Sequence, residues 1–493
     1  MSFELPKIHI NEPFSWGPPR GKVEAEDLRV KLYQKADSLL TIDWLDLADT
    51  SRQGAGQFTM VDNEQRIKAL RIMNSKNRRS GPERRVVRYA KNTRHTNFNN
   101  AKRNIPLLPD TVRVSSDVRV IASFLQGDLS KMQMGGNLPT VSDISLHNRP
   151  FVYDNNMDKA NCKAPVRLGS VKSEDFVRAD TTSDDALRSI LKSETPDGGP
   201  VVVTTDEVLA LMMTCSRSVH PWHLRFYRHG RFIFITKEEH SNIEKQWVDE
   251  TADATRRSAE DEVVSSESIV ALEEESYAAN NAFVAQACLK TRYQMKCEKD
   301  PFPEKRPRLY RYRRYVMHGD TPDRYDLIVR CEVDAVQNNN YIRLFGLLEH
   351  CAAGVSSEWR NVLDSQMARC MSTEYRRNAQ KMARWVSLCY LSGAYMKVGF
   401  ITRCRKANGK SDPSLHEVLG TYTGDTTSLA GHLGLKPANM WATADAFIMS
   451  FMKQNDFDDA MLVKLAGEHS IRLIESIDDD YDDDEDDDGE DED

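Results

Sequence analysis

The stretch "YDLIVRCEVDAVQ", residues 325–337, decides the fold because it has the pattern of a strand with two unlike faces. Successive side chains of a strand point to opposite sides of the sheet. One face is apolar and carries Tyr325, Leu327, Val329, Cys331 and Val333. The other face carries Asp326, Ile328, Arg330, Glu332 and Asp334. A charged row on an interior strand leaves three interpretations open: a metal site, a nucleic-acid site or a solvated face.

The composition predicts a cytoplasmic protein that does not enter membranes. The chain has 493 residues, enough for two or three domains, and 40% of them are hydrophobic. No apolar run is long enough to span a bilayer, and "MSFELPKIHINEPF" lacks the pattern of a signal peptide. The nine cysteines include no C-x-x-C pair, which favours reduced thiols and argues against a zinc ribbon.

Charge is distributed very unevenly along the chain. Residues 66–103 hold thirteen Lys or Arg and one acid, whereas residues 478–493 hold eleven Asp and three Glu. A basic arm and an acidic tail favour polyanion binding with electrostatic tuning, although both can also be solvated ends. Ser476, directly before the acidic tail, is a predicted phosphorylation site for an acid-directed kinase, and an unmodified spacer is the alternative. We assign 476–493 as a disordered acidic tail.

Residues 1–115 show little sustained periodicity and are expected to be extended and partly disordered. Phe14, Trp16 and Trp44 lie in this polar region, which is too poor in apolar residues to build its own core. We expect them to dock on a partner protein. Packing of the segment against its own domain is the alternative.

Residues 116–475 are predicted to form one mixed α+β domain. Helices are expected at 204–219, 268–290, 378–393 and within 425–456. A hairpin is expected at 222–236, and strands at 308–317, 325–336, 341–348, 366–377, 395–405, 415–423, 460–466 and 470–475. Residues 242–275 are polar and acidic and have the composition of an insertion loop.

The charged row gains a possible partner in "CMSTEYRR", residues 370–377. If this segment is a strand, Glu374 and Arg376 share a face, and Glu374 could join Glu332 and Asp334 around Mg²⁺. Arg376, however, stands where such a site needs a lysine, and arginine keeps its charge at neutral pH. Pairing of the carboxylates with Arg330 and Arg376 is the alternative.

Other catalytic patterns are lacking. The chain contains no GxxxxGK[ST], G-x-S-x-G or H-E-x-x-H. We therefore predict no catalytic residue, no bound metal and no cofactor.

The segment "RPRLYRYRRYVMH", residues 306–318, has the composition of an RNA-binding strand. Tyr310 and Tyr312 fall on one face for base stacking, with Arg311 and Arg313 on the other for phosphates. Core tyrosines with a solvated arginine face are the alternative. Recognition of a methylated, positively charged purine requires an aromatic face and a carboxylate.

Five motifs then resemble one known family. They are "TDEVLALMMTCSRSVHPW", "YRYRRYVMHGD", "DLIVRCEVDAV", "WRNVLDSQMA" and "KMARWVSLCYLSGAYMKVGFITR". In this order they are similar to the d subunits of eukaryotic translation initiation factor three. "NEPFSWGPP" and the acidic tail resemble the two ends of that family.

The resemblance implies a cup-shaped α+β domain similar to decapping exoribonucleases. Glu332-Val333-Asp334 looks like the Glu-x-Asp motif of those enzymes, and Glu374-Tyr375-Arg376 like their Glu-x-Lys motif with its lysine lost. The family reads the 5′ cap of mRNA rather than cleaving RNA. A metal-dependent decapping exoribonuclease and a pure scaffold are the alternatives.

The resemblance also implies functional residues and partners. The positions matching the cap contacts are Asp206, Val219, His220, Ser276, Asn280 and Asn281. A gate over the RNA path matches residues 242–256, with Asn242, Trp247, Asp249, Glu250 and Arg256. The implied partners are the other subunits of the factor, the e subunit above all, the small ribosomal subunit and capped mRNA.

Overall fold

The computed structural model describes most of the predicted domain. The described residues are 110–114, 118–169, 184–194, 198–238, 241–250, 269–302, 308–319, 321–350, 358–406, 411–454 and 456–476. Four predicted features lie outside them: the docking residues Phe14, Trp16 and Trp44, the basic segment 66–103, the gate residue Arg256 and the tail beyond Ser476.

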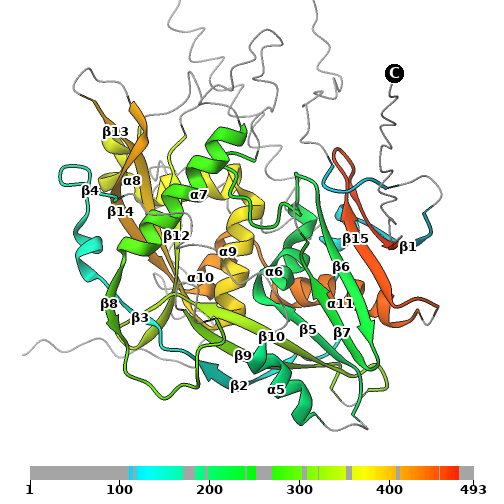
Figure 1. The fold of residues 1–493 in the computed structure, drawn as a ribbon. Coiled ribbons are helices and arrows are strands. Elements are labelled where there is room, and N and C mark those ends of the chain that lie inside the picture. The colour runs from blue at the N-terminus through cyan, green and yellow to red at the C-terminus, as the bar shows by residue number, and fades with distance from the viewer. Residues whose placement is uncertain are drawn as a thin grey trace, which may run out of the picture. The chain divides into compact units, whose positions relative to one another are not determined.

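A nine-stranded sheet forms one half of the fold (Figure 1). Its strands, in spatial order, are β1 (Val120–Leu125), β16 (Ser470–Glu475), β15 (Asp459–Lys464), β6 (Trp222–His229), β7 (Phe232–Thr236), β5 (Val201–Thr205), β10 (Tyr325–Val333), β9 (Leu309–Met317) and β2 (Thr140–His147). Strand β10 runs parallel to β5 and antiparallel to β9, so it is an interior strand as the sequence predicts.

A seven-stranded sheet forms the other half. Its order is β4 (Val166–Arg167), β14 (Ser411–Gly424), β13 (Tyr395–Arg405), β12 (Asn340–Leu348), β11 (Ala335–Gln337), β3 (Phe151–Tyr153) and β8 (Cys288–Arg292). The chain passes from β10 into β11 through the single residue Asp334. The stretch 325–337 therefore joins the two sheets.

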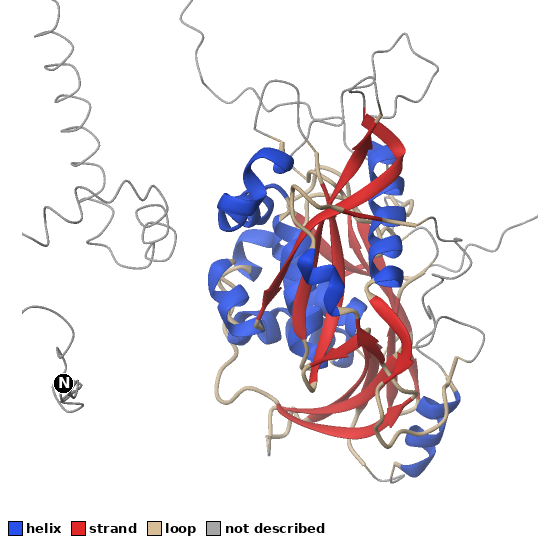
Figure 2. Cartoon of the chain, turned by 90° about the vertical axis from the view of Figure 1, so that its left-hand side faces the viewer, coloured by secondary structure: helices blue, strands red, loops and turns tan. Residues whose placement is uncertain are grey.

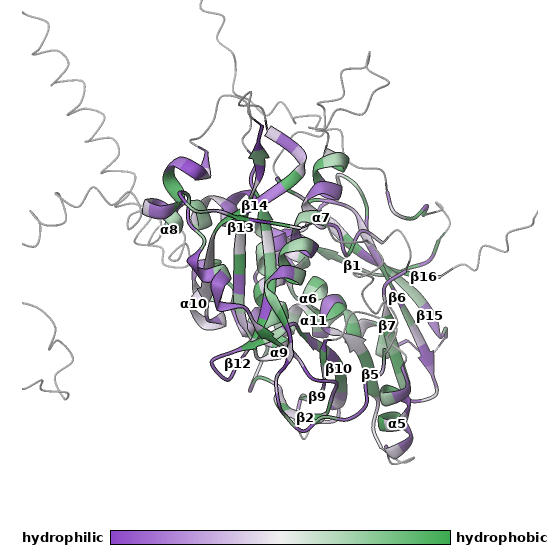
Figure 3. Ribbon diagram, turned by 60° about the vertical axis from the view of Figure 1, so that its left-hand side comes forward, coloured by the Kyte–Doolittle hydropathy of each residue, from purple (hydrophilic) through white to green (hydrophobic). Residues whose placement is uncertain are grey.

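Helices fill the space along both sheets (Figure 2). They are α4 (Gln126–Leu129), η1 (Asn155–Lys159), α5 (Asp185–Ser193), α6 (Asp206–Thr214), η3 (Cys215–Arg217), α7 (Ile269–Gln286), α8 (Trp359–Arg377), α9 (Ala379–Ser392), α10 (Thr426–His432) and α11 (Pro437–Met452). Helix α9 contacts α6 and strands of both sheets. The main core lies around α9, between α6 and the two sheets. Figure 3 shows α6 and β12 largely in the hydrophobic colour.

Both faces of β10 are buried. Leu327, Val329 and Cys331 belong to the main core. Ile328, on the other face, packs in a second core under helix α5. The charged residues of this face consequently lie in the interior, and the interpretation as a solvated face is wrong.

Helix α7 lies directly on the seven-stranded sheet because two glycines leave room for it. A Cβ atom at Gly346 would lie 2.9 Å from Cα of Asn280, and one at Gly399 would lie 2.5 Å from a ring carbon of Phe283. Neither position tolerates a side chain without movement of α7. The two glycines thus set the depth at which α7 packs.

Most predicted elements are confirmed, including the helix after Thr205, the 222–236 hairpin and the helix that begins near Asn378. The mixed α+β class is confirmed as well. The strand predicted at 366–377 is wrong, because this segment continues helix α8. A kink at Gln366 begins it, and its buried side chains Cys370, Met371 and Glu374 recur at helical spacing. Among the described residues, no helix is both long and apolar enough to cross a membrane.

Candidate functional site

The charged row of β10 forms a buried network of ion pairs. Arg330 donates to Asp184 at the start of α5, at 2.9 Å. Glu332 pairs with Arg308, whose Nε also lies 3.6 Å from Asp334. All five side chains are buried. Guanidinium groups therefore balance the carboxylates that the sequence offers as metal ligands.

Asp206, a predicted cap contact, belongs to the same network. The hydroxyl of Thr205 caps helix α6 and places Asp206 in its first turn. The carboxylate of Asp206 pairs with Arg343 from β12 and accepts the backbone N–H of Glu332 at 3.1 Å. Burial raises the pKa of Asp206. Only 1% of the residue is exposed, so its position fits a structural ion pair rather than an open binding surface.

Glu374 does not join Glu332 and Asp334, so the predicted three-carboxylate cluster is wrong. Because 366–377 is helical, Glu374 lies at the junction of α8 and α9, where it accepts from Asn378 at 2.7 Å. Arg376 is exposed. In the part of the chain that the structure describes, no group of three His, Cys, Asp or Glu side chains is arranged to hold a metal ion.

The predicted stacking face of β9 is also contradicted. Tyr310 and Tyr312 are 2% and 0% exposed and pack in the core under α5, where no base can reach them. Arg311 and Arg313 both pair with Asp143, at 2.7 and 3.1 Å, and donate to backbone carbonyls at the end of α9. These arginines thus cap a helix C-terminus.

Three predicted cap contacts on α7 are buried against the sheet. Ser276 and Asn280 are each 1% exposed, and Asn281 is 7% exposed. The side-chain oxygen of Asn280 accepts the backbone N–H of Gly346 at 2.8 Å. In this structure these residues hold α7 on β12 and do not line the pocket described below.

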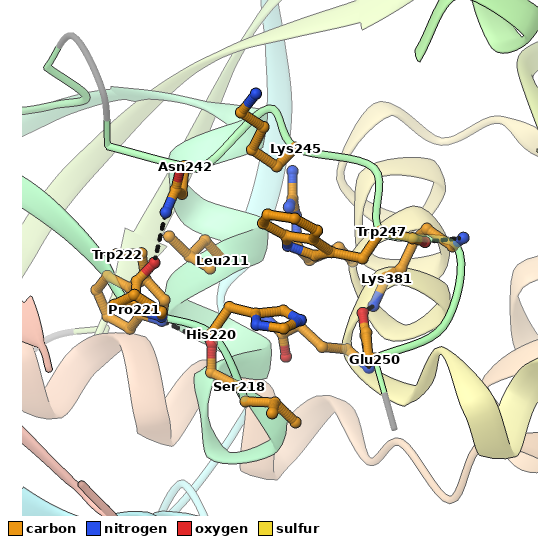
Figure 4. A pocket seen from close by; sticks show the side chains of 13 residues that line it. Leu211, Ser218, His220, Pro221, Trp222, Asn242, Lys245, Trp247, Glu250 and Lys381 are labelled. Atoms are coloured by element: carbon orange, nitrogen blue, oxygen red, sulfur yellow. Dashed lines mark hydrogen bonds between the residues drawn. The ribbon is translucent and has the colours of Figure 1, made fainter. Parts of the chain in front are cut away.

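Val219 and His220 do meet the predicted gate. A pocket forms where the loop 242–250 crosses the end of α6 and the start of α9 (Figure 4). Its lining residues are Leu211, Ser218, Val219, His220, Pro221, Trp222, Asn242, Lys245, Trp247, Glu250, Gln380, Lys381 and Arg384. The indole of Trp247 contacts the imidazole of His220, with ring centroids 4.4 Å apart and the ring planes tilted by 44°. The structure therefore shows this loop closed over His220.

The loop is held at the N-terminus of α9. Helix α9 has no cap from its own Asn378 side chain, which donates instead to the carbonyl of Val248. The Glu250 carboxylate takes the capping role and accepts the backbone N–H groups of Gln380 and Lys381, at 2.9 and 2.8 Å. A carboxylate at this position also interacts favourably with the helix dipole.

Further contacts tie the same loop to its surroundings. The ammonium group of Lys381 donates to the carbonyl of Trp247 at 2.5 Å. Burial lowers the pKa of Lys381, although the carboxylates of Glu374 and Glu250 oppose this effect. At the other side, Lys245 pairs with Glu273 of α7 at 2.8 Å. Asp249 lies 3.9 Å from Arg377.

Some buried polar atoms of the pocket have no partner in the part of the chain that the structure describes. Among the described residues, none donates to or accepts from either ring nitrogen of His220 or either amide atom of Gln380. Burial lowers the pKa of His220 to about 4, with a smaller contribution from Lys464, so the ring is neutral near pH 7. Such atoms cost stability unless a ligand or water satisfies them.

Sequence reasoning does not identify Gln380 and Lys381 as site residues. The sequence carries no signal for them, because the helix predicted at 378–393 begins with Asn378, a residue that favours the N-cap position. In the structure, the first N–H groups of α9 take their acceptor from a distant segment instead. The sequence alone does not show that this segment is the loop 242–250.

Comparisons with known proteins agree with the motifs. A model of the family described as "Eukaryotic translation initiation factor 3 subunit 7 (eIF-3)" matches residues 48–475. Relatives named as the D subunit of eukaryotic translation initiation factor 3 are 30% identical over 62% of this chain in Xenopus tropicalis and 32% identical over 61% in Homo sapiens. Each match covers 55% of the relative, so the chain spans about half the length of these curated relatives.

A solved structure also resembles this fold. Candida albicans Rai1, determined in complex with pU5-Mn²⁺, is 13% identical and has a TM-score of 0.42 over 71% of this chain and 92% of that chain.

Proposed function

Because this chain belongs to the family of subunit 7 of eukaryotic translation initiation factor 3, we propose that it acts in translation initiation by binding the 5′ cap of mRNA. The observation that carries the proposal is the closed pocket at His220. An aromatic face, a buried carboxylate and polar atoms without a partner among the described residues meet there, which is the chemistry that a methylated guanine requires.

The closed loop implies that binding needs a conformational change. Two rings with a base between them must stand about 7 Å apart, which is twice the ordinary contact distance between carbon atoms. The rings of Trp247 and His220 are only 4.4 Å apart. We therefore assign the loop 242–250 as the described part of the gate, and its Trp247 ring must leave His220 before a base can stack there.

We further propose that the chain binds RNA without cleaving it. Arg308 and Arg343 compensate the carboxylates of Asp206, Glu332 and Asp334, so a divalent cation would have to displace two buried guanidinium groups. Breaking such pairs is costly. Incubation of the purified chain with RNA and Mg²⁺ or Mn²⁺ should leave the RNA intact. Hydrolysis that disappears in Glu332→Gln would overturn this part of the proposal.

The proposed setting is the cytoplasm and the assembled initiation factor. The N-terminal region 1–115 is proposed to dock on other subunits of the factor, the e subunit above all, through Phe14, Trp16 and Trp44. The complex would bring the chain to the small ribosomal subunit, and phosphorylation at Ser476 would extend the acidic tail. Co-purification of a Trp16→Ala, Trp44→Ala double variant with the complex tests the docking, because its loss is expected.

Crosslinking to cap-labelled RNA tests the central proposal. The full chain should crosslink weakly, and Trp247→Ala should crosslink several-fold more strongly because His220 becomes accessible. Adding His220→Ala should abolish the preference for capped over uncapped RNA. Leu289→Ala, on strand β8 and 40% exposed, is the matched control and should behave like the parent chain. Equal crosslinking of capped and uncapped RNA by the Trp247→Ala chain would refute cap binding at this pocket.

A further inference from the structure

The pocket around His220 is closed by Trp247, which does not satisfy the polar atoms beneath it. His220 and Gln380 each bury two polar atoms without a partner among the described residues, and Gln380 is only 7% exposed. Trp247 covers the pocket, but an indole offers one N–H donor and no acceptor. The closed state therefore leaves these polar atoms without hydrogen bonds from the described residues.

The shape of the covering group indicates what the pocket takes. An indole is a fused five- and six-membered ring system, as a purine is, and Trp247 contacts the imidazole at a centroid distance of 4.4 Å. Purines present donors and acceptors along their edges, whereas the benzene ring of an indole presents none. A purine in the same place would therefore keep the ring contact and add the missing hydrogen bonds.

We propose that Trp247 occupies the place of the cap guanine, and that Gln380 and Glu250 read the edge of that base once the Trp247 ring swings away while Glu250 stays on α9. The inference rests on the proposed cap-binding function and names the residues that give it base specificity. The Gln380 amide can donate to guanine O6 and accept from N1–H.

Glu250 supplies the selectivity against adenine. Its carboxylate offers about four lone-pair positions, and two backbone N–H groups of α9 use two of them. The remaining positions can accept the exocyclic amine of guanine, which adenine lacks at that position. Lys245, Lys381 and Arg384 also line the pocket and suit the charge of a triphosphate.

Thermal-shift titration of the full-length Trp247→Ala chain with mononucleotides tests the inference. 7-Methylguanosine triphosphate should raise the melting temperature of this variant, while the unchanged chain should not respond at the same concentrations. 7-Methylinosine triphosphate lacks the exocyclic amine, and both it and ATP should bind roughly tenfold to a hundredfold more weakly, as expected for the loss of one base-edge contact. Equal binding of all three nucleotides would overturn the role of Glu250.

Gln380→Leu in the Trp247→Ala background should weaken binding of 7-methylguanosine triphosphate by a similar factor. Gln294→Leu, an exposed position, is the matched control and should leave binding unchanged. The melting temperature without nucleotide distinguishes a role of Gln380 in base recognition from a role in stabilising the fold. In the otherwise unchanged chain, Gln380→Leu removes two unsatisfied buried atoms, so its melting temperature should stay equal or rise. A lower melting temperature would show that Gln380 supports the fold and would overturn the inference.

The two proposals can fail separately. Crosslinking of capped RNA without any response to 7-methylguanosine triphosphate would overturn this inference and leave cap binding in place. A thermal response to that nucleotide without preferential crosslinking of capped RNA would support the base pocket and overturn the proposed function. Absence of both responses would overturn both.

Discussion

The closure of the loop 242–250 depends most on Glu250, and Glu250→Ala is expected to open it. The Glu250 carboxylate accepts the backbone N–H groups of Gln380 and Lys381 and is 5% exposed. Its own backbone N–H donates to the carbonyl of Arg377 at 3.1 Å. The substitution removes the side-chain cap of α9 and leaves the backbone hydrogen bond of the loop in place.

The size of the effect follows from the hydrogen bonds that the substitution removes. Removal of a helix N-cap costs about 0.5–2 kcal/mol, and hydrogen bonds to a charged group contribute about 1.5–3 kcal/mol. Burial raises the pKa of Glu250. Part of the free energy of these hydrogen bonds therefore offsets the cost of burying the charged carboxylate. A net change of about 2 kcal/mol in the opening free energy corresponds to about 30-fold in the opening equilibrium.

Hydrogen exchange read by mass spectrometry measures this equilibrium directly. Amides in 244–250 and at the start of α9 should exchange about 30-fold faster in Glu250→Ala, because exchange of these amides requires opening. Amides of β5 and α6 should be unchanged. Glu244→Ala is the matched control, since Glu244 is partly exposed and pairs with Lys237 near the surface, so exchange should change less than about fivefold. Unchanged exchange in Glu250→Ala would refute the view that this residue holds the loop.

Three further predictions concern stability. Gly399→Ala should lower the free energy of unfolding by about 1–3 kcal/mol in urea titrations, because the new methyl group meets the ring of Phe283. Arg343→Met should cost about 3–5 kcal/mol, because it leaves the buried carboxylate of Asp206 unpaired, and the loss should shrink at low pH as buried carboxyl groups take up protons. His220 has a pKa of about 4 in the folded chain, against 6.5 normally, so the unfolded chain binds its proton first. Stability should therefore fall as pH drops from 6.5 towards 4, by up to about 2 kcal/mol at pH 5, and His220→Asn should remove this component.

Each of these predictions has its own control. Gly127→Ala, where nothing lies within 4 Å of the added methyl group, should not destabilise the chain. If Gly399→Ala unfolds like the parent chain, α7 does not pack as closely as described. A pH-independent loss in Arg343→Met would contradict the ion-pair account. Identical pH profiles for the parent chain and His220→Asn would contradict the burial of a neutral imidazole.

The fold is largely predictable where periodicity is clear. The alternation in 325–337 predicts an interior strand, and the structure confirms it as β10. The strand prediction for 366–377 fails because alternation over eight residues can also be produced by chance, whereas the buried Cys370, Met371 and Glu374 follow the helical period. Charge is a poor guide to exposure, since Arg330 and Glu332 are buried with partners from distant segments.

The candidate site is only partly predictable because it is built from long-range contacts. The resemblance to a family points to His220 and Trp247, and the structure brings these two rings together. It does not bring Asn280 into the same pocket. Gln380 carries no motif of its own, and its importance comes from the loop that covers it. Only the three-dimensional arrangement shows that its amide is buried without a partner among the described residues.

Two buried polar centres in this fold differ in how burial is compensated, and the difference indicates where a ligand belongs. At the first, Asp206 pairs with Arg343, and burial raises the pKa of Asp206. A carboxyl group there that exceeds the number of guanidinium partners can therefore take up a proton. At the second, Gln380 has an amide that cannot change its protonation, and protonation of His220 would add a buried charge. Protonation can therefore relieve surplus charge at the first centre, where Oδ1 of Asp206 also lacks a partner among the described residues. At the second centre no change of protonation supplies the missing hydrogen bonds, so a ligand or water must bring them.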